Sequence, residues 1–143
     1  QGEVVVRNIL FPFILKKMDY SFIPWTLFGD IEVSKIGLDV IEARKKYKRI
    51  HTYSLDLNNE RSLITFEKAF FLKIICDSKF NIVGATCIGE RAGEIIGFLQ
   101  LMIGNKIKFY KVMNSVQAYP TYTYYIRNLA KKAYVDYLKS FLP

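Results

Sequence analysis

The feature that most constrains the fold of this chain is the spacing of apolar residues between Glu90 and Ile103. They recur every three or four positions, as expected for one face of a helix with about 3.6 residues per turn. These residues are Ala92, Ile95, Ile96, Leu99, Met102 and Ile103. Gly104 follows as a stop signal, and the same spacing predicts a second long amphipathic helix over Thr121–Phe141. Each helix therefore needs an apolar surface to pack against.

Two glycines, Gly93 and Gly97, lie one turn apart inside the first helix. Each costs about 1 kcal/mol of helix stability relative to alanine. A helix that accepts this cost usually has another backbone close by. Two explanations are open: the glycines let the helix lie close to a sheet, or they let two helices meet.

Apolar runs ahead of this helix predict a sheet. Ala69–Cys76 and Phe80–Gly89 are β-prone and are separated by a polar turn, which predicts an antiparallel hairpin. His51–Leu57 is a further strand candidate, and Asn58–Ser62 is predicted to be a loop.

Two more strands are predicted nearer the start of the chain. Ile23–Phe28 has the composition of a buried strand, and Ile31–Gly37 that of a half-buried one with Ile31 and Val33 on its apolar face. Asp39 is the predicted N-cap of a short helix. Strands and helices are segregated along the chain, which predicts an α+β fold with an antiparallel sheet covered on one side by helices.

The net positive charge of the chain is compatible with binding to an acidic partner. Lys and Arg outnumber Asp and Glu by 21 to 13, a net charge of +8, which permits binding to nucleic acid or acidic surfaces. The basic residues are scattered, however, and their densest cluster, Ala43–Arg49, is typical of the solvent face of a helix. A free-standing basic binding module is therefore the alternative interpretation. The longest apolar stretch, Ile95–Gly104, is about half a membrane span, so no membrane association is expected.

The residues that usually carry chemistry are few. Cys76 and Cys87 both lie in apolar runs, which favours buried free thiols and a reducing, cytoplasmic setting. The single histidine, His51, has no neighbouring partner in the sequence and is interpreted as an ordinary strand residue. No metal site is expected from this set.

Three motifs, in order along the chain, resemble the C-terminal domain of the pyridine nucleotide-disulfide oxidoreductases. The first, PWTLFGDIEVSKIG, is similar to the family's P-x-x-x-F-T-D-P-E-x-x-x-x-G, with Gly29 and Ile31 departing from it. The second, IVGATCIGERAGEII, is similar to G-A-x-x-x-G-x-x-A-x-E-x-I. The third, AYPTYTYY, lies where the family carries His-Pro-Thr-x-x-Glu. The matching residues are Pro24, Phe28, Asp30, Glu32, Gly37, Gly84, Ala85, Gly89, Ala92, Glu94, Ile96, Pro120 and Thr121.

The resemblance implies a dimerisation domain that forms a homodimer and completes the partner's active site. The parent is then an oxidoreductase that uses FAD and NAD(P)H, and both cofactors belong to its other domains. Residues 1–19 are expected to be the tail of a preceding FAD/NAD domain and a linker, with the dimerisation domain over 20–143. No cofactor and no activity are expected of this fragment alone.

The resemblance also points to site residues. Tyr119 stands at the position of the family's acid/base histidine and Tyr124 at that of its orienting glutamate. A tyrosine at the histidine position resembles the mercuric-reductase-like branch. Because the ordinary pKa of a phenol is about 10, a tyrosine is a poor base at neutral pH. Pro120, expected to cap the following helix, and Thr121 are expected on the side of the partner's flavin.

The expected dimer interface follows from the same motifs. It comprises Gly93, Glu94, Gly97, Tyr119 and Tyr122. One alternative is that the tyrosines form only an aromatic interface patch, since tyrosine is enriched at such surfaces. Another is that they mark a parent that has lost disulfide chemistry.

Overall fold

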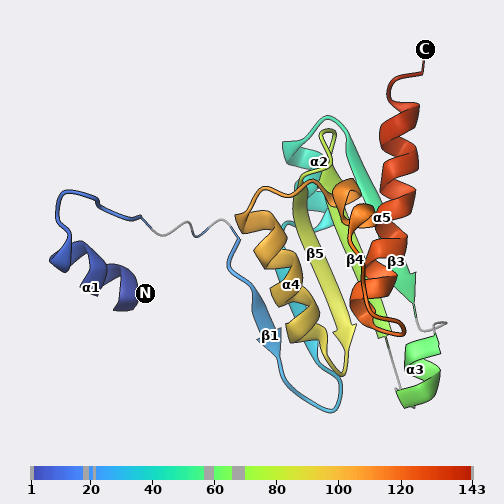
Figure 1. Ribbon diagram of the computed structural model, residues 1–143, viewed down its shortest axis with the longest axis horizontal. Coiled ribbons are helices and arrows are strands. Elements are labelled where there is room, and N and C mark those ends of the chain that lie inside the picture. Colours follow the sequence, from blue (N-terminus) through green and yellow to red (C-terminus); the bar gives the residue numbers. More distant parts are fainter. Residues whose placement is uncertain (1, 18–19, 21, 57–59, 66–69, 143) are drawn as a thin grey trace.

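The computed structural model describes residues 2–17, 20, 22–56, 60–65 and 70–142. Its centre is a five-stranded antiparallel sheet in the order β1-β2-β5-β4-β3 (Figure 1). The strands are β1 (Trp25–Leu27), β2 (Val33–Gly37), β3 (Ile50–Asp56), β4 (Phe70–Asp77) and β5 (Ile82–Gly89). The predicted hairpin is the β4–β5 pair at the middle of the sheet, and the α+β class is confirmed.

Two long helices cover one face of this sheet. They are α4 (Ala92–Gly104), which packs on β5 and β2, and α5 (Tyr122–Lys139), which packs on β3 and on the 3-10 helix η1 (Phe109–Asn114). The main core lies between these helices and the sheet. It includes Ile36, Leu72, Ile74, Ile96, Leu99, Ile126 and Leu129, all almost fully buried.

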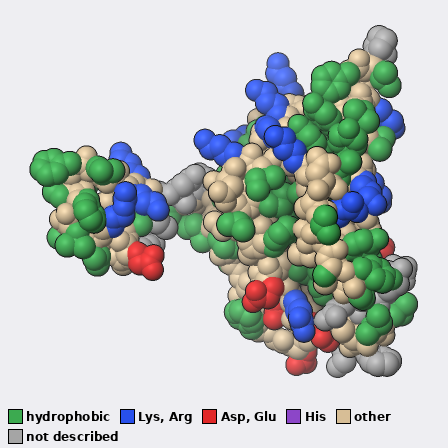
Figure 2. Space-filling model, viewed as in Figure 1, with side chains coloured by type: hydrophobic (Ala, Val, Ile, Leu, Met, Phe, Trp, Pro, Cys, Tyr) green, Lys and Arg blue, Asp and Glu red, His purple; other side chains and the backbone are tan. Residues whose placement is uncertain are grey.

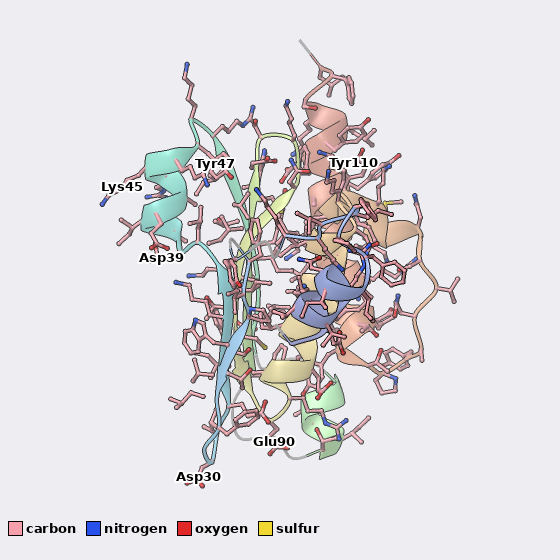
Figure 3. The ribbon with its side chains drawn as sticks, turned by 90° about the vertical axis from the view of Figure 1, so that its left-hand side faces the viewer. Asp30, Asp39, Lys45, Tyr47, Glu90 and Tyr110 are labelled. Carbon is pink, nitrogen blue, oxygen red and sulfur yellow. The ribbon has the colours of Figure 1, made fainter. Side chains whose placement is uncertain are left out.

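The opposite face of the sheet is not bare, which corrects the expectation of helices on one side only. The short helix α2 (Val40–Lys46) lies there, as the edge-on view in Figure 3 shows. Its Ala43 is buried against Ile75 and Val83 in a small second core. The predicted cap is confirmed, because Asp39 accepts a hydrogen bond from the Glu42 backbone N–H (2.8 Å) and the Glu42 side chain accepts one from the Asp39 N–H.

The strands β1 and β2 form where they were predicted, but the prediction of which side chains they bury was wrong. β1 is an edge strand with exposed Trp25 and Leu27 rather than a buried one. In β2 the buried side chains are Ser34 and Ile36, whereas Val33 is only half-buried. Ser34 tolerates burial because its hydroxyl donates to the Trp25 carbonyl (2.9 Å) and also contacts the Thr26 hydroxyl (2.8 Å).

Two further segments complete the chain. Near the N-terminus, within the expected tail of a preceding domain, the chain forms a helix, α1 (Gly2–Leu10), which has no buried residue and lies apart from the sheet in Figure 1. The predicted loop Asn58–Ser62 is partly wrong, because α3 (Glu60–Thr65) begins inside it, while Asn58 and Asn59 lie outside the described residues.

Candidate dimerisation surface

The loop that carries Tyr119 is held to the body of the molecule by hydrogen bonds. The Arg127 guanidinium donates through Nε to the Ser115 carbonyl (2.8 Å). The Ser115 hydroxyl in turn donates to the Val112 carbonyl (2.7 Å) and accepts from the Gln117 side-chain amide (3.0 Å). The loop therefore presents Tyr119 from an anchored backbone.

The cap of α5 comes from Thr121 rather than from Pro120, which corrects that expectation. The Thr121 hydroxyl oxygen accepts from the Tyr124 backbone N–H (3.2 Å), and the same hydroxyl donates to the Ala118 carbonyl (2.6 Å). Proline has no side-chain oxygen to accept a hydrogen bond from a helix N–H, and it lies one residue ahead of the cap. In the single chain, Thr121 thus fixes where the helix begins.

The four tyrosines of this region divide into two pairs. Tyr122 is only 8% exposed and stacks on Phe70 (ring centroids 4.4 Å apart), and Tyr125 is buried beside it. Tyr119 is 61% exposed, and half-buried Tyr124 lies edge-on to it with centroids 5.1 Å apart. Tyr122 therefore has little area left for a second copy of the chain, whereas Tyr119 has most of its surface free.

The outer surface of α4 carries an exposed stripe along the helix. It comprises Glu94, Gly97, Leu101 and Gly104, called here the α4 stripe. The spacing of three, four and three residues places them on one face. Leu101 is 60% exposed, and a Cβ added at Gly97 or Gly104 would meet no atom within 4 Å. The stripe thus combines a large apolar side chain with two points at which another backbone can approach closely.

The two helical glycines that were predicted as a pair have different surroundings. A Cβ at Gly93 would lie 3.2 Å from the Thr26 hydroxyl oxygen of β1, so Gly93 lets α4 lie close to the sheet. Gly97 faces open space. The Gly93 backbone N–H also donates to the Glu32 carboxylate (3.1 Å), a cap of α4 that the helix pattern did not indicate.

Charge is distributed unevenly along this surface. Glu90 and Glu94 lie at the start of α4, and Lys106 and Lys108 follow its end. Figure 2 shows mainly acidic side chains, with a basic side chain among them, near the lower end of this face and basic side chains near its upper end. Acidic groups at a helix N-terminus and basic groups at its C-terminus also complement the helix dipole.

The buried thiols and the histidine lie away from this surface. Cys76 and Cys87 are buried thiols that are not joined in a disulfide, as predicted, and burial raises the pKa of Cys76 well above its usual range. His51 stacks on Phe80 at 4.6 Å between centroids, and burial lowers its pKa. Within the described ranges, no group of three or more His, Cys, Asp or Glu side chains is arranged to hold a metal ion, and no helix is long and apolar enough to cross a membrane.

A sheet covered by two helices, with an exposed stripe on one of them, defines an α+β domain suited to association. The model of the family described as "Pyridine nucleotide-disulphide oxidoreductase, dimerisation domain" matches residues 23–130. The chain belongs to this family.

Curated relatives and solved structures extend the match. A dihydrolipoyl dehydrogenase from Mycoplasma genitalium is 26% identical over 139 residues, covering 96% of this chain and 30% of that protein. A mercuric reductase from Shewanella putrefaciens is 26% identical over 107 residues, or 73% of this chain and 19% of that protein. The chain therefore spans less than a third of the length of these relatives.

The fold is shared with solved structures at low sequence identity. LpdA from Mycobacterium tuberculosis superposes with a TM-score of 0.79 at 18% identity, over 90% of this chain and 28% of that one. The HOCl-induced flavoprotein disulfide reductase RclA from Escherichia coli gives the same TM-score and identity, over 89% of this chain and 30% of that one.

Proposed function

We propose that this domain joins two copies of its parent oxidoreductase into a homodimer through the α4 stripe. The observation that carries the proposal is Gly97, which interrupts a helix yet contacts nothing in the single chain. A helical glycine costs about 1 kcal/mol relative to alanine. A second copy of the chain packing closely against Gly97 would offset this cost. Leu101, one turn further along α4, adds exposed apolar area to the same surface.

The charge distribution favours an antiparallel pair of α4 helices related by a two-fold axis. In such an interface each residue contacts the partner's surface reciprocally, so the surface must complement itself. An antiparallel pair brings the Glu90 and Glu94 end of one helix toward the Lys106 end of the other, and it also aligns the helix dipoles favourably. A parallel pair would place like charges together.

Site-directed cross-linking tests this arrangement. With Leu101→Cys, a short bis-maleimide should convert most of the chain into a covalent dimer on a denaturing gel, because the axis passes close to this residue. The two native thiols are buried and should not react. The matched control is Ile41→Cys on α2, which is 68% exposed on the opposite face of the sheet. Efficient cross-linking of the Ile41→Cys variant, with none of the Leu101→Cys variant, would move the interface to the other face.

We propose further that Tyr119 lies beside the partner's active site in the parent and donates a hydrogen bond there. It is exposed on an anchored loop, and its neighbour Tyr124 offers a ring edge instead of the carboxylate that would sustain a base. Its role is then to shape and polarise the approach of substrate without taking up a proton.

Substitutions in the full-length parent separate this role from packing. Tyr119→Phe removes one hydroxyl and almost no area, so turnover should fall by roughly tenfold while the dimer persists, as expected for the loss of one hydrogen bond to a reacting system. Unchanged turnover in Tyr119→Phe, together with a weaker dimer in Tyr119→Ala, would make Tyr119 a packing residue only.

We infer that FAD and NAD(P)H bind the parts of the parent that precede this domain, and that the enzyme works in the cytoplasm. The domain begins near residue 20, and the exposed apolar side of α1 belongs to the preceding domain. The length of the relatives and the absence of any buried residue in α1 support the placement of the cofactors and of the domain boundary. Two buried cysteines that are not joined in a disulfide suit a reducing compartment and support the cytoplasmic setting.

A further inference from the structure

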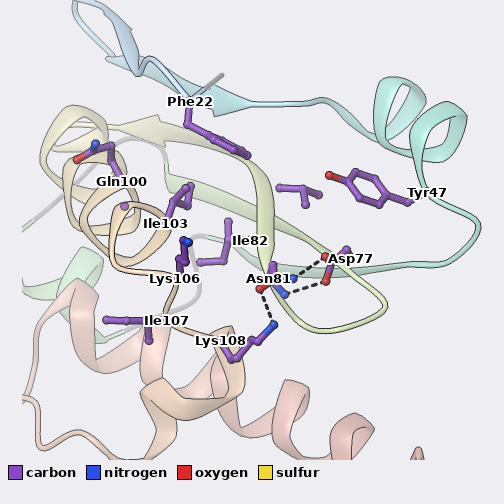
Figure 4. A pocket seen from close by; sticks show the side chains of 12 residues that line it. Phe22, Tyr47, Asp77, Asn81, Ile82, Gln100, Ile103, Lys106, Ile107 and Lys108 are labelled. Atoms are coloured by element: carbon purple, nitrogen blue, oxygen red, sulfur yellow. Dashed lines mark hydrogen bonds between the residues drawn. The ribbon is translucent and has the colours of Figure 1, made fainter. Parts of the chain in front are cut away.

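A hollow of about 610 Å³ lies at the far end of α4, where Gly104, the last residue of the α4 stripe, forms part of its wall. The last turn of α4 and the segment after it form one wall, the β4–β5 turn forms the floor, and Phe22 and Tyr47 approach from the other side (Figure 4). Small-molecule sites commonly have volumes of roughly 300–1,000 Å³. The hollow is therefore large enough for a compact organic molecule.

The lining is mostly apolar, with a few polar groups at one side. Ile82, Ile103 and Ile107 provide aliphatic surface, and Phe22 and Tyr47 provide rings. Tyr47 points its hydroxyl toward the interior in Figure 4. Apolar walls with a small number of polar groups are typical of a ligand site.

Two lysines give the hollow a positive character. The Lys108 ammonium donates to the Asn81 side-chain oxygen (2.6 Å), which fixes it at the wall. Lys106 lines the hollow between Ile103 and Ile82 in Figure 4. Within the described part of the chain, neither ammonium lies within 4.0 Å of a carboxylate oxygen.

The single carboxylate in the lining is already engaged. Asp77 accepts hydrogen bonds from the backbone N–H groups of Lys79 (2.8 Å) and Asn81 (2.9 Å) and from the Asn81 side-chain amide (2.6 Å). These bonds hold its charge in the β4–β5 turn. The lysines consequently leave positive charge available to a ligand that can also use the apolar walls.

We propose that this hollow binds a small organic carboxylate with an aromatic or branched apolar body. The carboxylate accepts hydrogen bonds from Lys106 and Lys108, and the body lies against the isoleucines and the ring of Phe22. A charge-assisted hydrogen bond of this kind contributes more than a neutral one. The hollow adjoins the proposed dimerisation surface, because Gly104 of the α4 stripe and Lys106 both line it. All of its lining residues come from one copy of the chain, so the titration does not require a dimer.

The test is an amide-resolved NMR titration of the ¹⁵N-labelled chain at fixed salt with 2-naphthoate. The expected Kd is on the order of 0.1–1 mM, which suits a ligand of this size. Shifts should concentrate on Asn81, Ile82 and the amides from Lys106 to Lys108. The neutral analogue 2-naphthalenemethanol should bind about tenfold more weakly, because it lacks the charge.

Single substitutions test whether Lys106 and Lys108 are the residues that bind the carboxylate. Lys106→Gln and Lys108→Gln should each raise the Kd for 2-naphthoate about five- to tenfold. Lys131→Gln, a matched change at an exposed position on α5, should leave the Kd within about twofold. Equal binding of the neutral analogue, shifts located elsewhere, or no saturation at several millimolar would each overturn the proposal.

Discussion

Replacing Gly97 with arginine is expected to convert the proposed homodimer into folded monomers. The position is helical, exposed and free of neighbours within 4 Å, so the single chain has room for a long side chain. Removing the glycine should even favour the helix by up to about 1 kcal/mol. In the proposed interface, however, two-fold symmetry introduces two arginines where the backbones meet. Because like charges in an interface cost several kcal/mol, the dissociation constant should rise at least about 100-fold.

Light scattering at micromolar concentration measures the change in mass, and far-ultraviolet circular dichroism checks that the fold is retained. The matched control is Ile41→Arg, which places the same side chain at an exposed helical position on the opposite face of the sheet. That variant should remain dimeric. An unchanged dimer in Gly97→Arg would remove α4 from the interface.

The largest loss of stability is expected from Gly84→Ala. Gly84 of β5 lies opposite Gly37, the last residue of β2, in the ladder between these two strands. A Cβ at Gly84 would overlap the Leu38 carbonyl oxygen, a backbone atom that cannot rotate away. Gly37 has a φ of +66°, so the same strand pair also depends on a backbone conformation that other residues rarely adopt. Forcing the strands apart should cost about 3 kcal/mol or more.

Thermal unfolding followed by circular dichroism tests this prediction. For a chain of this size, a loss of about 3 kcal/mol corresponds to a fall in Tm of roughly 10 °C. Gly29→Ala is the control, because a Cβ there would meet the Ile31 carbonyl oxygen at an ordinary 3.7 Å. Equal Tm values for the two variants would mean that β2 and β5 can separate without penalty.

The sequence predicted best those elements in which apolar residues recur at regular spacing. The α4 pattern and the β4–β5 hairpin each repeat an apolar signal over several residues, and Asp39 carries its capping partner Glu42 three residues on. The faces of β1 and β2 were not predictable in this way. Burial of Ser34 depends on hydrogen bonds to Trp25 and Thr26 across the strand pair, which no local pattern records.

The sequence identified the segment that contains the candidate site, but not which of its side chains are exposed. Motif positions identified the segment around Tyr119, but four tyrosines in sequence look alike until the packing of α5 separates exposed Tyr119 from buried Tyr122. The two explanations for the glycines also needed the structure, because Gly93 faces β1 and Gly97 faces solvent. The cap that Glu32 provides for α4 joins residues 61 positions apart. Its only sequence signal was the family motif in which Glu32 stands.

Sedimentation equilibrium of the unmodified chain at micromolar concentration tests the central claim most directly. A homodimer should sediment at twice the 16.7 kDa mass of the chain and dissociate only on dilution. Raising the salt concentration should leave it largely intact, since the proposed interface at Gly97 and Leu101 depends on apolar contact. A single species at 16.7 kDa across the whole concentration range would contradict the assignment of dimerisation to the surface of this domain.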